Sequence, residues 1–245
     1  MGDAVDAVRA DRDAVLEMAA GLTVQQWETE SGCEGWSMQD LLTHMSLTFW
    51  AMVDPGRLAD THGLPFERAQ DALVQARRYL EPAEVVADYA EVSERALQML
   101  PEIAALDAEL PLGDVGTYPA SALPTAFGFD HFTHVRMDMF GPRGPLGGSP
   151  PPSDELRVAT ALDWIEAALP QQNQAAAAAG TFEFQITGAG ARLITFGRGQ
   201  AMAAVTSDAL DFVRWVTQRG SWADLGVQTA GDDLALAAAR TLRVF

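Results

Sequence analysis

The stretch SGCEGWSMQDLLTH, residues 31–44, decides the fold of the first half of the chain. Ser37 has the residue type of a helix N-cap, and Asp40 follows three residues later, nearly as in a capping box. Apolar residues then recur at helical spacing from Leu41 onward. The sequence therefore predicts a helix that starts after Ser37 and carries His44 in its second turn.

Helices are predicted on both sides of this stretch. Apolar residues recur at helical spacing in several other segments, and loops that contain Gly and Pro lie at 54–65 and 110–124. Long helices joined by irregular connections are typical of a bundle, so we expect a four-helix bundle in this half. The predicted helices cover residues 5–20, 66–80, 82–100 and 124–141.

The pattern changes in the second half of the chain. A Gly- and Pro-rich segment at 141–153 precedes a further helix at 154–169, and apolar and polar residues later alternate as in half-buried strands. We therefore expect an α+β protein, with a helical bundle over 1–170 and a small α+β domain over 180–245. Strands are predicted at 182–186, 192–196 and 201–205, and helices at 208–216 and 234–242.

The chain is strongly acidic, which limits its partners. Its 16 basic residues, all of them Arg, are outnumbered by 34 acidic ones, and the formal net charge is −18. Binding to nucleic acid draws its free energy from basic side chains on phosphates, so no nucleic-acid partner is expected. The first residues lack the apolar core of a signal peptide, and no apolar run is long enough to span a bilayer. We expect a cytoplasmic protein without a membrane partner, and the single cysteine, Cys33, agrees with a reducing compartment.

Asp130 and His134 are the first candidates for chemistry. They are four residues apart in a predicted helix, so both side chains lie on one face. Carboxylate and imidazole are suitable ligands for a borderline cation such as Zn²⁺, and His44 on another helix can supply a third ligand. Three protein ligands leave a position for water or substrate. The alternative interpretation is an ordinary polar pair on a helix surface.

Three further residues have two interpretations each. His131 follows Asp130 directly, so its side chain points about 100° away from the pair. This favours a role in packing or in orienting a metal ligand, and the alternative is that His131 replaces Asp130 as the ligand. Asp138 either orients His134 or forms a salt bridge with an Arg. A thiolate at Cys33 would gain from the helix dipole, but the local sequence offers no base, so packing is favoured.

Trp27, together with the 31–44 stretch, resembles the signature of the mycothiol-dependent maleylpyruvate isomerases, a branch of the DinB-like superfamily. In that family a Trp, a Ser-x-Cys-x-Gly-Trp-Ser/Thr turn and an Asp-Leu-x-x-His helix supply the first metal ligand, which is His44 here. The second motif of the family is Glu-x-x-x-His, and Asp130 and His134 occupy its places. The resemblance implies that these three residues bind a divalent metal, usually Zn²⁺, with the shorter Asp as a departure from the pattern.

The resemblance extends over nearly the whole chain. The family has a small α+β domain, similar to sterol-carrier-like folds, that ends in a Gly-Asp turn and a last helix; Gly231 and Asp232 match that turn. An Arg of this domain, normally in a Gly-Arg pair, is functionally important in the family. Gln218 and Arg219 are the nearest match, so the resemblance implies that Arg219 is the catalytic and thiol-binding residue. A solvated residue at a helix end is the alternative interpretation of Arg219.

The resemblance also implies a function. The thiol of mycothiol, or of another low-molecular-weight thiol, binds the metal, loses its proton and adds to a small electrophile. Reversible addition makes the enzyme an isomerase, whereas retained addition makes it an S-transferase. Two alternatives are a metal-dependent hydrolase, which needs no thiol, and a non-catalytic binding protein on the same bundle.

Overall fold

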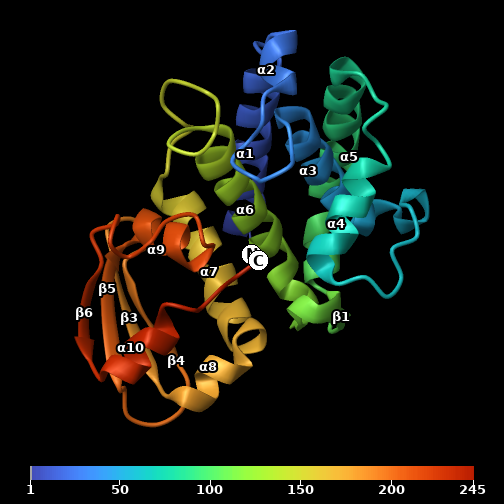
Figure 1. Ribbon diagram of the computed structural model, residues 1–245. Helices are drawn as coiled ribbons and strands as arrows, with labels where there is room; N and C mark the ends of the chain where they lie inside the picture. Colours follow the sequence, from blue (N-terminus) through green and yellow to red (C-terminus); the bar gives the residue numbers. More distant parts are fainter. Residues whose placement is uncertain (1) are drawn as a thin grey trace.

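The N-terminal half is a helical bundle. The computed structural model describes residues 2–245, and the long helices of its first half run past one another around a common core (Figure 1). Each long helix contributes to this core, with side chains that include Val8, Leu41, Phe49, Tyr89 and Phe127. The helices are α1 (Gly2–Ala19), α2 (Val24–Glu28), α3 (Met38–Val53), α4 (Phe66–Gln75), α5 (Pro82–Ala104) and α6 (Leu123–Thr133).

Helix α3 begins where the capping residues predict. The Ser37 hydroxyl accepts a hydrogen bond from the Asp40 N–H at 3.1 Å, and the Asp40 carboxylate accepts one from the Ser37 N–H at 3.0 Å. These two bonds satisfy backbone donors that the first turn of a helix leaves free. The predicted helix is therefore confirmed, and His44 lies in its second turn.

Helix α6 differs from the prediction beyond Thr133. The chain continues there as a π-helix, His134–Met139, whose turn is wider than an α-helical turn. In this segment the Asp138 carbonyl accepts a hydrogen bond from the Gly32 N–H at 2.7 Å. A continuous α-helix to residue 141 was the wrong prediction, because a contact with a loop about a hundred residues away shapes this turn.

Other boundaries shift by a few residues. The helix predicted at 66–80 ends at Gln75, whereas the helix predicted at 82–100 continues to Ala104. The predicted loop at 110–124 contains a hairpin of β1 (Glu109–Pro111) and β2 (Thr117–Pro119), whose strands are too short to produce an alternating pattern. Within residues 2–245, no helix combines the length and the apolar character that crossing a bilayer requires.

The second half contains a four-stranded sheet, and the predicted α+β fold class is confirmed. The strand order is β4-β3-β5-β6; β3 is parallel to β5, and the other neighbours are antiparallel. The first two predicted strands are confirmed, the third starts two residues later than predicted, and β6 was not predicted. The strands are β3 (Phe182–Thr187), β4 (Arg192–Phe196), β5 (Ala203–Asp208) and β6 (Gln228–Gly231).

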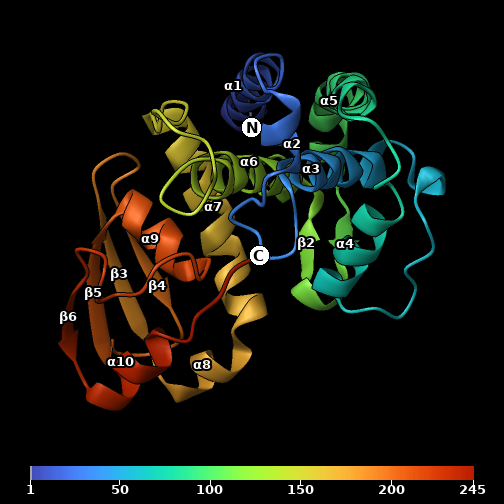
Figure 2. The ribbon, with the colours of Figure 1, turned by 45° about the horizontal axis from the view of Figure 1, so that its top comes forward.

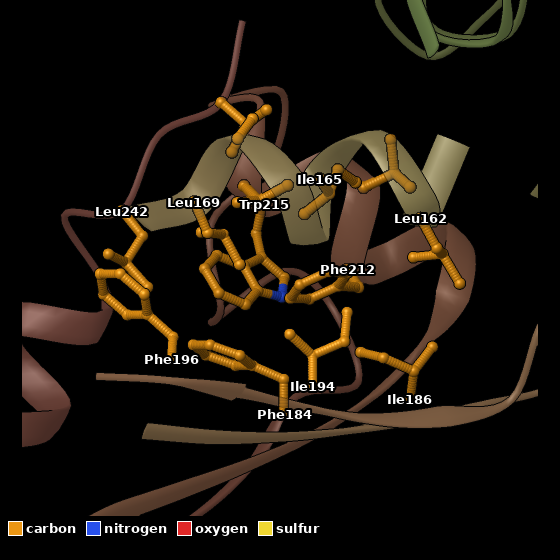
Figure 3. Packing of buried hydrophobic residues seen from close by; sticks show 14 of the residues in the cluster. Leu162, Ile165, Leu169, Phe184, Ile186, Ile194, Phe196, Phe212, Trp215 and Leu242 are labelled. Atoms are coloured by element: carbon orange, nitrogen blue, oxygen red, sulfur yellow. The ribbon is translucent and has the colours of Figure 1, made fainter. Parts of the chain in front are cut away.

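Helices cover one face of this sheet and bury its apolar side chains. In Figure 3, the strand residues Phe184 and Ile194 point toward Phe212 and Trp215 of the short helix α9 (Ala209–Val216). Helix α7 (Glu155–Gln172) completes the layer with apolar residues such as Leu162, Ile165 and Leu169. The chain also forms α8 (Gln174–Ala179) and α10 (Asp233–Ala239) at this end of the molecule (Figure 2).

Helix α7 packs on both halves of the molecule. It contacts the sheet through one core, and Phe129 and Phe132 of α6 belong to that same core. Gly128 allows α6 to approach α7 closely, because a Cβ atom at this position would lie 2.3 Å from the Thr160 methyl group. The boundary expected at residue 170 therefore falls at the end of a helix that is shared by the bundle and the sheet region.

Candidate metal centre

Three predicted ligands converge between α3 and α6. The Nε2 atom of His44 lies 3.2 Å from Oδ1 of Asp130, and the Nε2 atom of His134 lies 3.5 Å from the same oxygen. One ligand atom from each residue lies within 4.8 Å of the other two. The two imidazole rings stand nearly perpendicular, with centroids 5.0 Å apart. The structure thus brings together the three residues that the sequence analysis selected from two distant segments.

Both histidines are oriented by an acceptor on their other ring nitrogen. Nδ1 of His44 lies 3.2 Å from Oε1 of Gln70 on α4, and Nδ1 of His134 lies 2.8 Å from Oδ2 of Asp138. Each Nδ1 can therefore carry the proton and donate outward, which leaves a lone pair on Nε2. This pattern, in which the second nitrogen donates to a carboxylate or carbonyl group, is usual for histidines that bind metals.

The buried carboxylate of Asp130 favours a positive charge at the centre of the cluster. Burial alone would raise the pKa of Asp130, but His134 and His44 hold that pKa well below its usual range, so the carboxylate is ionised. The Oδ2 atom of Asp130 is buried, and no hydrogen-bond partner for it is found within the described residues. Burial would lower the pKa of His134, yet the Asp130 charge raises it well above its usual value. A proton or a metal ion between these atoms satisfies this demand.

Asp138 connects the cluster to Arg219. Its carboxylate accepts hydrogen bonds from Arg219 at 2.9 Å to Oδ1 and 2.5 Å to Oδ2, in addition to the bond with His134. Burial would raise the pKa of Asp138, but these bonds hold it well below its usual range. Both interpretations of Asp138 are therefore realised at once, because one carboxylate orients His134 and pairs with an Arg. Asp138 thus links Arg219 to His134 of the candidate metal centre.

Cys33 lies beside this chain of contacts. Its Sγ atom is 3.7 Å from Nδ1 of His134 and 4.0 Å from Nη2 of Arg219, and the residue is half-buried. It also packs against the core of the bundle, as the sequence analysis favoured. His134, which lies 101 residues further along the chain, thus stands beside the thiol, but its Nδ1 faces Asp138, so packing remains the supported interpretation of Cys33.

Gln218 stands where the Gly-Arg pair of the family has its glycine. Its φ angle is +60°, in the left-handed region that glycine adopts without strain. The Gln218 side chain donates a hydrogen bond to the Leu242 carbonyl at 2.9 Å, which helps to hold this backbone. The position thus keeps the conformation that favours Gly, and Arg219 follows in the orientation that meets Asp138.

The other histidine of this helix lies outside the cluster. His131 is fully buried and bonds the Phe127 carbonyl at 3.0 Å and the Tyr89 hydroxyl at 2.9 Å. Both ring nitrogens are therefore occupied, and the structure supports packing for His131, with Asp130 as the residue that faces His44 and His134. Gln70 was missed by the sequence analysis, because a polar residue within a predicted helix carries no sign that it will contact His44.

The fold and these residues define a class of protein. The chain is a DinB-like helical bundle that carries a candidate metal centre, joined to an α+β region that supplies an Arg to the same place. The family model "Mycothiol maleylpyruvate isomerase N-terminal domain" matches residues 8–136. The chain therefore belongs to this family, which confirms the predicted resemblance and the prediction of an enzyme related to these isomerases.

Comparison with solved structures gives the same fold over both halves. A crystal structure of a mycothiol-dependent maleylpyruvate isomerase has a TM-score of 0.64 and 16% sequence identity, with 94% of this chain and 93% of that chain covered. The structure of a histidine-to-alanine mutant under the same name has a TM-score of 0.63 and 15% identity, with the same coverage. No curated protein sequence matches this chain.

Proposed function

We propose that this protein is a metal-dependent enzyme that uses mycothiol, or a similar low-molecular-weight thiol, to isomerise or thiolate a small electrophile. The family membership and the names of the similar structures support the thiol and the class of reaction. His44, Asp130 and His134 are the proposed ligands of a divalent metal, with Zn²⁺ as the expected ion.

The arrangement of the histidine nitrogens carries this proposal. Each Nδ1 lies against an acceptor, Gln70 or Asp138, so each Nε2 can offer its lone pair to a metal ion beside the Asp130 carboxylate. Two lone pairs and a carboxylate that face one another repel unless a proton or a metal ion lies between them, and these donor atoms lie close enough together for one ion to replace the protons. The Oδ2 atom of Asp130 is also buried without a hydrogen-bond partner among the described residues, and it lies 3.6 Å from Nδ1 of His131. A nitrogen and oxygen donor set of this kind fits Zn²⁺.

A bound divalent metal would lower the pKa of a coordinated thiol, so that the thiolate forms at neutral pH. The residues of the chain have positioning roles around it. Gln70 and Asp138 fix the two imidazole rings, and Arg219 holds Asp138 through a bidentate ion pair. Arg219 is thus proposed to act on the reaction by keeping His134 in place and by adding positive charge beside Cys33.

Metal content tests the proposal directly. We expect about one equivalent of a divalent metal in the purified protein by elemental analysis, and loss of that metal in the His44→Ala variant. His62→Ala is the matched control, because His62 is exposed in a loop and lies outside the cluster. Metal-free protein that takes up no Zn²⁺ even in excess would contradict the proposal and favour a non-catalytic binding protein.

Thiol dependence separates the possible reactions. An electrophilic cis-alkene should isomerise only when thiol and metal are both present if the enzyme is an isomerase, and a stable thioether should accumulate if it is an S-transferase. Turnover of the metal-loaded protein without any thiol would instead indicate a hydrolase, with water at the open position.

A further inference from the structure

A hollow lined by arginines lies next to Arg219, on the side of the C-terminal region. Its volume is about 470 Å³. The residues that matter for its chemistry are Arg143, Gln218, Arg219, Trp222 and Arg240; we call this place the arginine hollow. The segments that form it are the loop after the π-helix, the turn after α9 and the end of α10.

The charges of the arginine hollow are only partly neutralised. Arg219 is paired with Asp138, but within residues 2–245 no carboxylate oxygen lies within 4.0 Å of the Arg143 or Arg240 side-chain nitrogens. This is unusual in a chain with more than twice as many acidic as basic residues, where most arginines have an acidic partner. Two guanidinium groups without an acidic partner thus border one hollow.

The arginines of the hollow are held in place. Arg143 donates a hydrogen bond to the Gly32 carbonyl at 2.6 Å and a longer one to the Gln218 carbonyl at 3.4 Å. The Arg240 guanidinium lies over the Trp222 ring, 5.0 Å from its centroid. Both groups keep further N–H donors free, because these contacts use only part of the five that a guanidinium offers. A planar group with free paired donors is suited to a carboxylate.

We propose that the arginine hollow binds a carboxylate of one of the two reacting molecules, through Arg143 and Arg240. This inference rests on the proposed function, since Arg219 forms a wall of the hollow and is joined to the proposed metal ligand His134 through Asp138. Arg219, which lines the hollow, also lies 4.0 Å from the Cys33 thiol through its Nη2 atom. The hollow therefore selects an anionic electrophile or an anionic thiol over a neutral one.

Calorimetric titration with maleate, and with the neutral maleamide of the same size, tests the site itself. Maleate should bind and maleamide should not, and Arg143→Gln and Arg240→Gln should each weaken maleate binding about threefold to tenfold, because both groups are exposed and screened. Arg198→Gln is the matched control: it removes the same charge from an exposed arginine that does not line the hollow. Equal binding of maleate and maleamide, or an equal loss in all three variants, would overturn the proposal.

Steady-state kinetics then identify which molecule carries the carboxylate. If it is the electrophile, the Arg143→Gln and Arg240→Gln variants should raise KM for a carboxylated electrophile but not for its amide. If it is the thiol, KM should rise for N-acetylcysteine and not for N-acetylcysteamine. Unchanged KM in every case would overturn the proposal. The metal proposal and this proposal can fail separately. Maleate should still bind to the His44→Ala variant, and that binding should still depend on Arg143 and Arg240, whether or not the protein holds a metal ion.

Discussion

Gly32 sits where the loop before α3 meets the π-helix. A Cβ atom at this position would lie 2.7 Å from Cα and 2.9 Å from Oδ1 of Asp138, so the loop would have to move. We expect Gly32→Ala to lower the free energy of unfolding by about 1–3 kcal/mol. Because Asp138 orients His134, metal affinity should also fall by about tenfold or more. Stability is measured by urea unfolding, and metal affinity by competition with a chelator.

The matched control for this variant is Gly147→Ala. A Cβ atom at Gly147 would meet nothing within 4 Å, and the residue is not in the left-handed region. Its replacement should change neither stability nor metal affinity. Equal behaviour of the two alanine variants would show that the loop tolerates a side chain at Gly32.

Gln218 provides a second test at the scale of one residue. Because its φ angle is +60°, we expect Gln218→Gly to be more stable than Gln218→Ala by about 1 kcal/mol. Both variants lose the hydrogen bond to the Leu242 carbonyl, so their difference isolates the backbone strain. The opposite order is expected at Ala87 on the exposed face of α5, where Ala87→Gly should lower stability by about 1 kcal/mol. Urea unfolding of the three variants measures these differences. If Gln218→Ala were as stable as Gln218→Gly, the backbone at residue 218 would not be strained by a side chain.

The residues of the candidate site differ in how far the sequence could predict them. His44, Asp130 and His134 could be selected because imidazole and carboxylate groups stand at helical spacing or within a family motif. Their supporting partners could not, since Gln70 becomes a partner only when α4 lies beside α3. Likewise, Arg143 is one exposed arginine in a Pro- and Gly-rich loop, and only the fold brings it beside Arg240.

A buried ion pair fixes the π-helix to the rest of the bundle. Arg136 donates hydrogen bonds to both carboxylate oxygens of Asp11 on α1, at 2.9 and 2.8 Å, and Arg157 of α7 bonds the same carboxylate at 2.8 Å. Asp11 and Arg136 are both almost fully buried. The pair thus joins α1, the π-helix and α7 around one carboxylate.

Removal of this charge should be strongly destabilising. We expect Asp11→Asn to lower the free energy of unfolding by about 3 kcal/mol, because Arg136 would keep a buried charge without an acidic partner. The control is Asp13→Asn, which removes an exposed partner of Arg12 and should change stability by about 0.5 kcal/mol or less. Urea denaturation measures both values, and equal effects of the two substitutions would contradict the proposed anchoring of the π-helix.

Elements with a strong local pattern could be predicted, and those shaped by distant contacts could not. The strand 192–196 was predicted with its observed limits, because Ile194, Thr195 and Phe196 are residue types that favour strands. The edge strand β6, by contrast, is exposed at every position and has no apolar face to mark it. The π-helix was missed because the residues that contact it, Gly32 and Asp11, are distant in sequence and lie in other elements.

At the scale of the whole molecule, the proposed site needs both halves. The proposed metal ligands come from the bundle, whereas Arg219 and Arg240 come from the α+β region. Helix α7 fixes these halves relative to each other, because its residues share one core with α6 and with the sheet. The relative position of the halves is therefore part of the proposed catalytic arrangement.

We expect the chain to unfold as one cooperative unit, although chains of this length often unfold in steps. Unfolding of the sheet region would expose the apolar faces of α7 and α6, so the bundle should not stay folded without it. Differential scanning calorimetry should show one transition whose van't Hoff and calorimetric enthalpies agree. Phe184→Ala, which opens a cavity in the core of the sheet region, should lower that single transition without splitting it, and should speed hydrogen exchange in α3 as well as in β3. Two separate transitions, with exchange in α3 unchanged by Phe184→Ala, would instead show that the bundle of residues 1–170 is an independent domain.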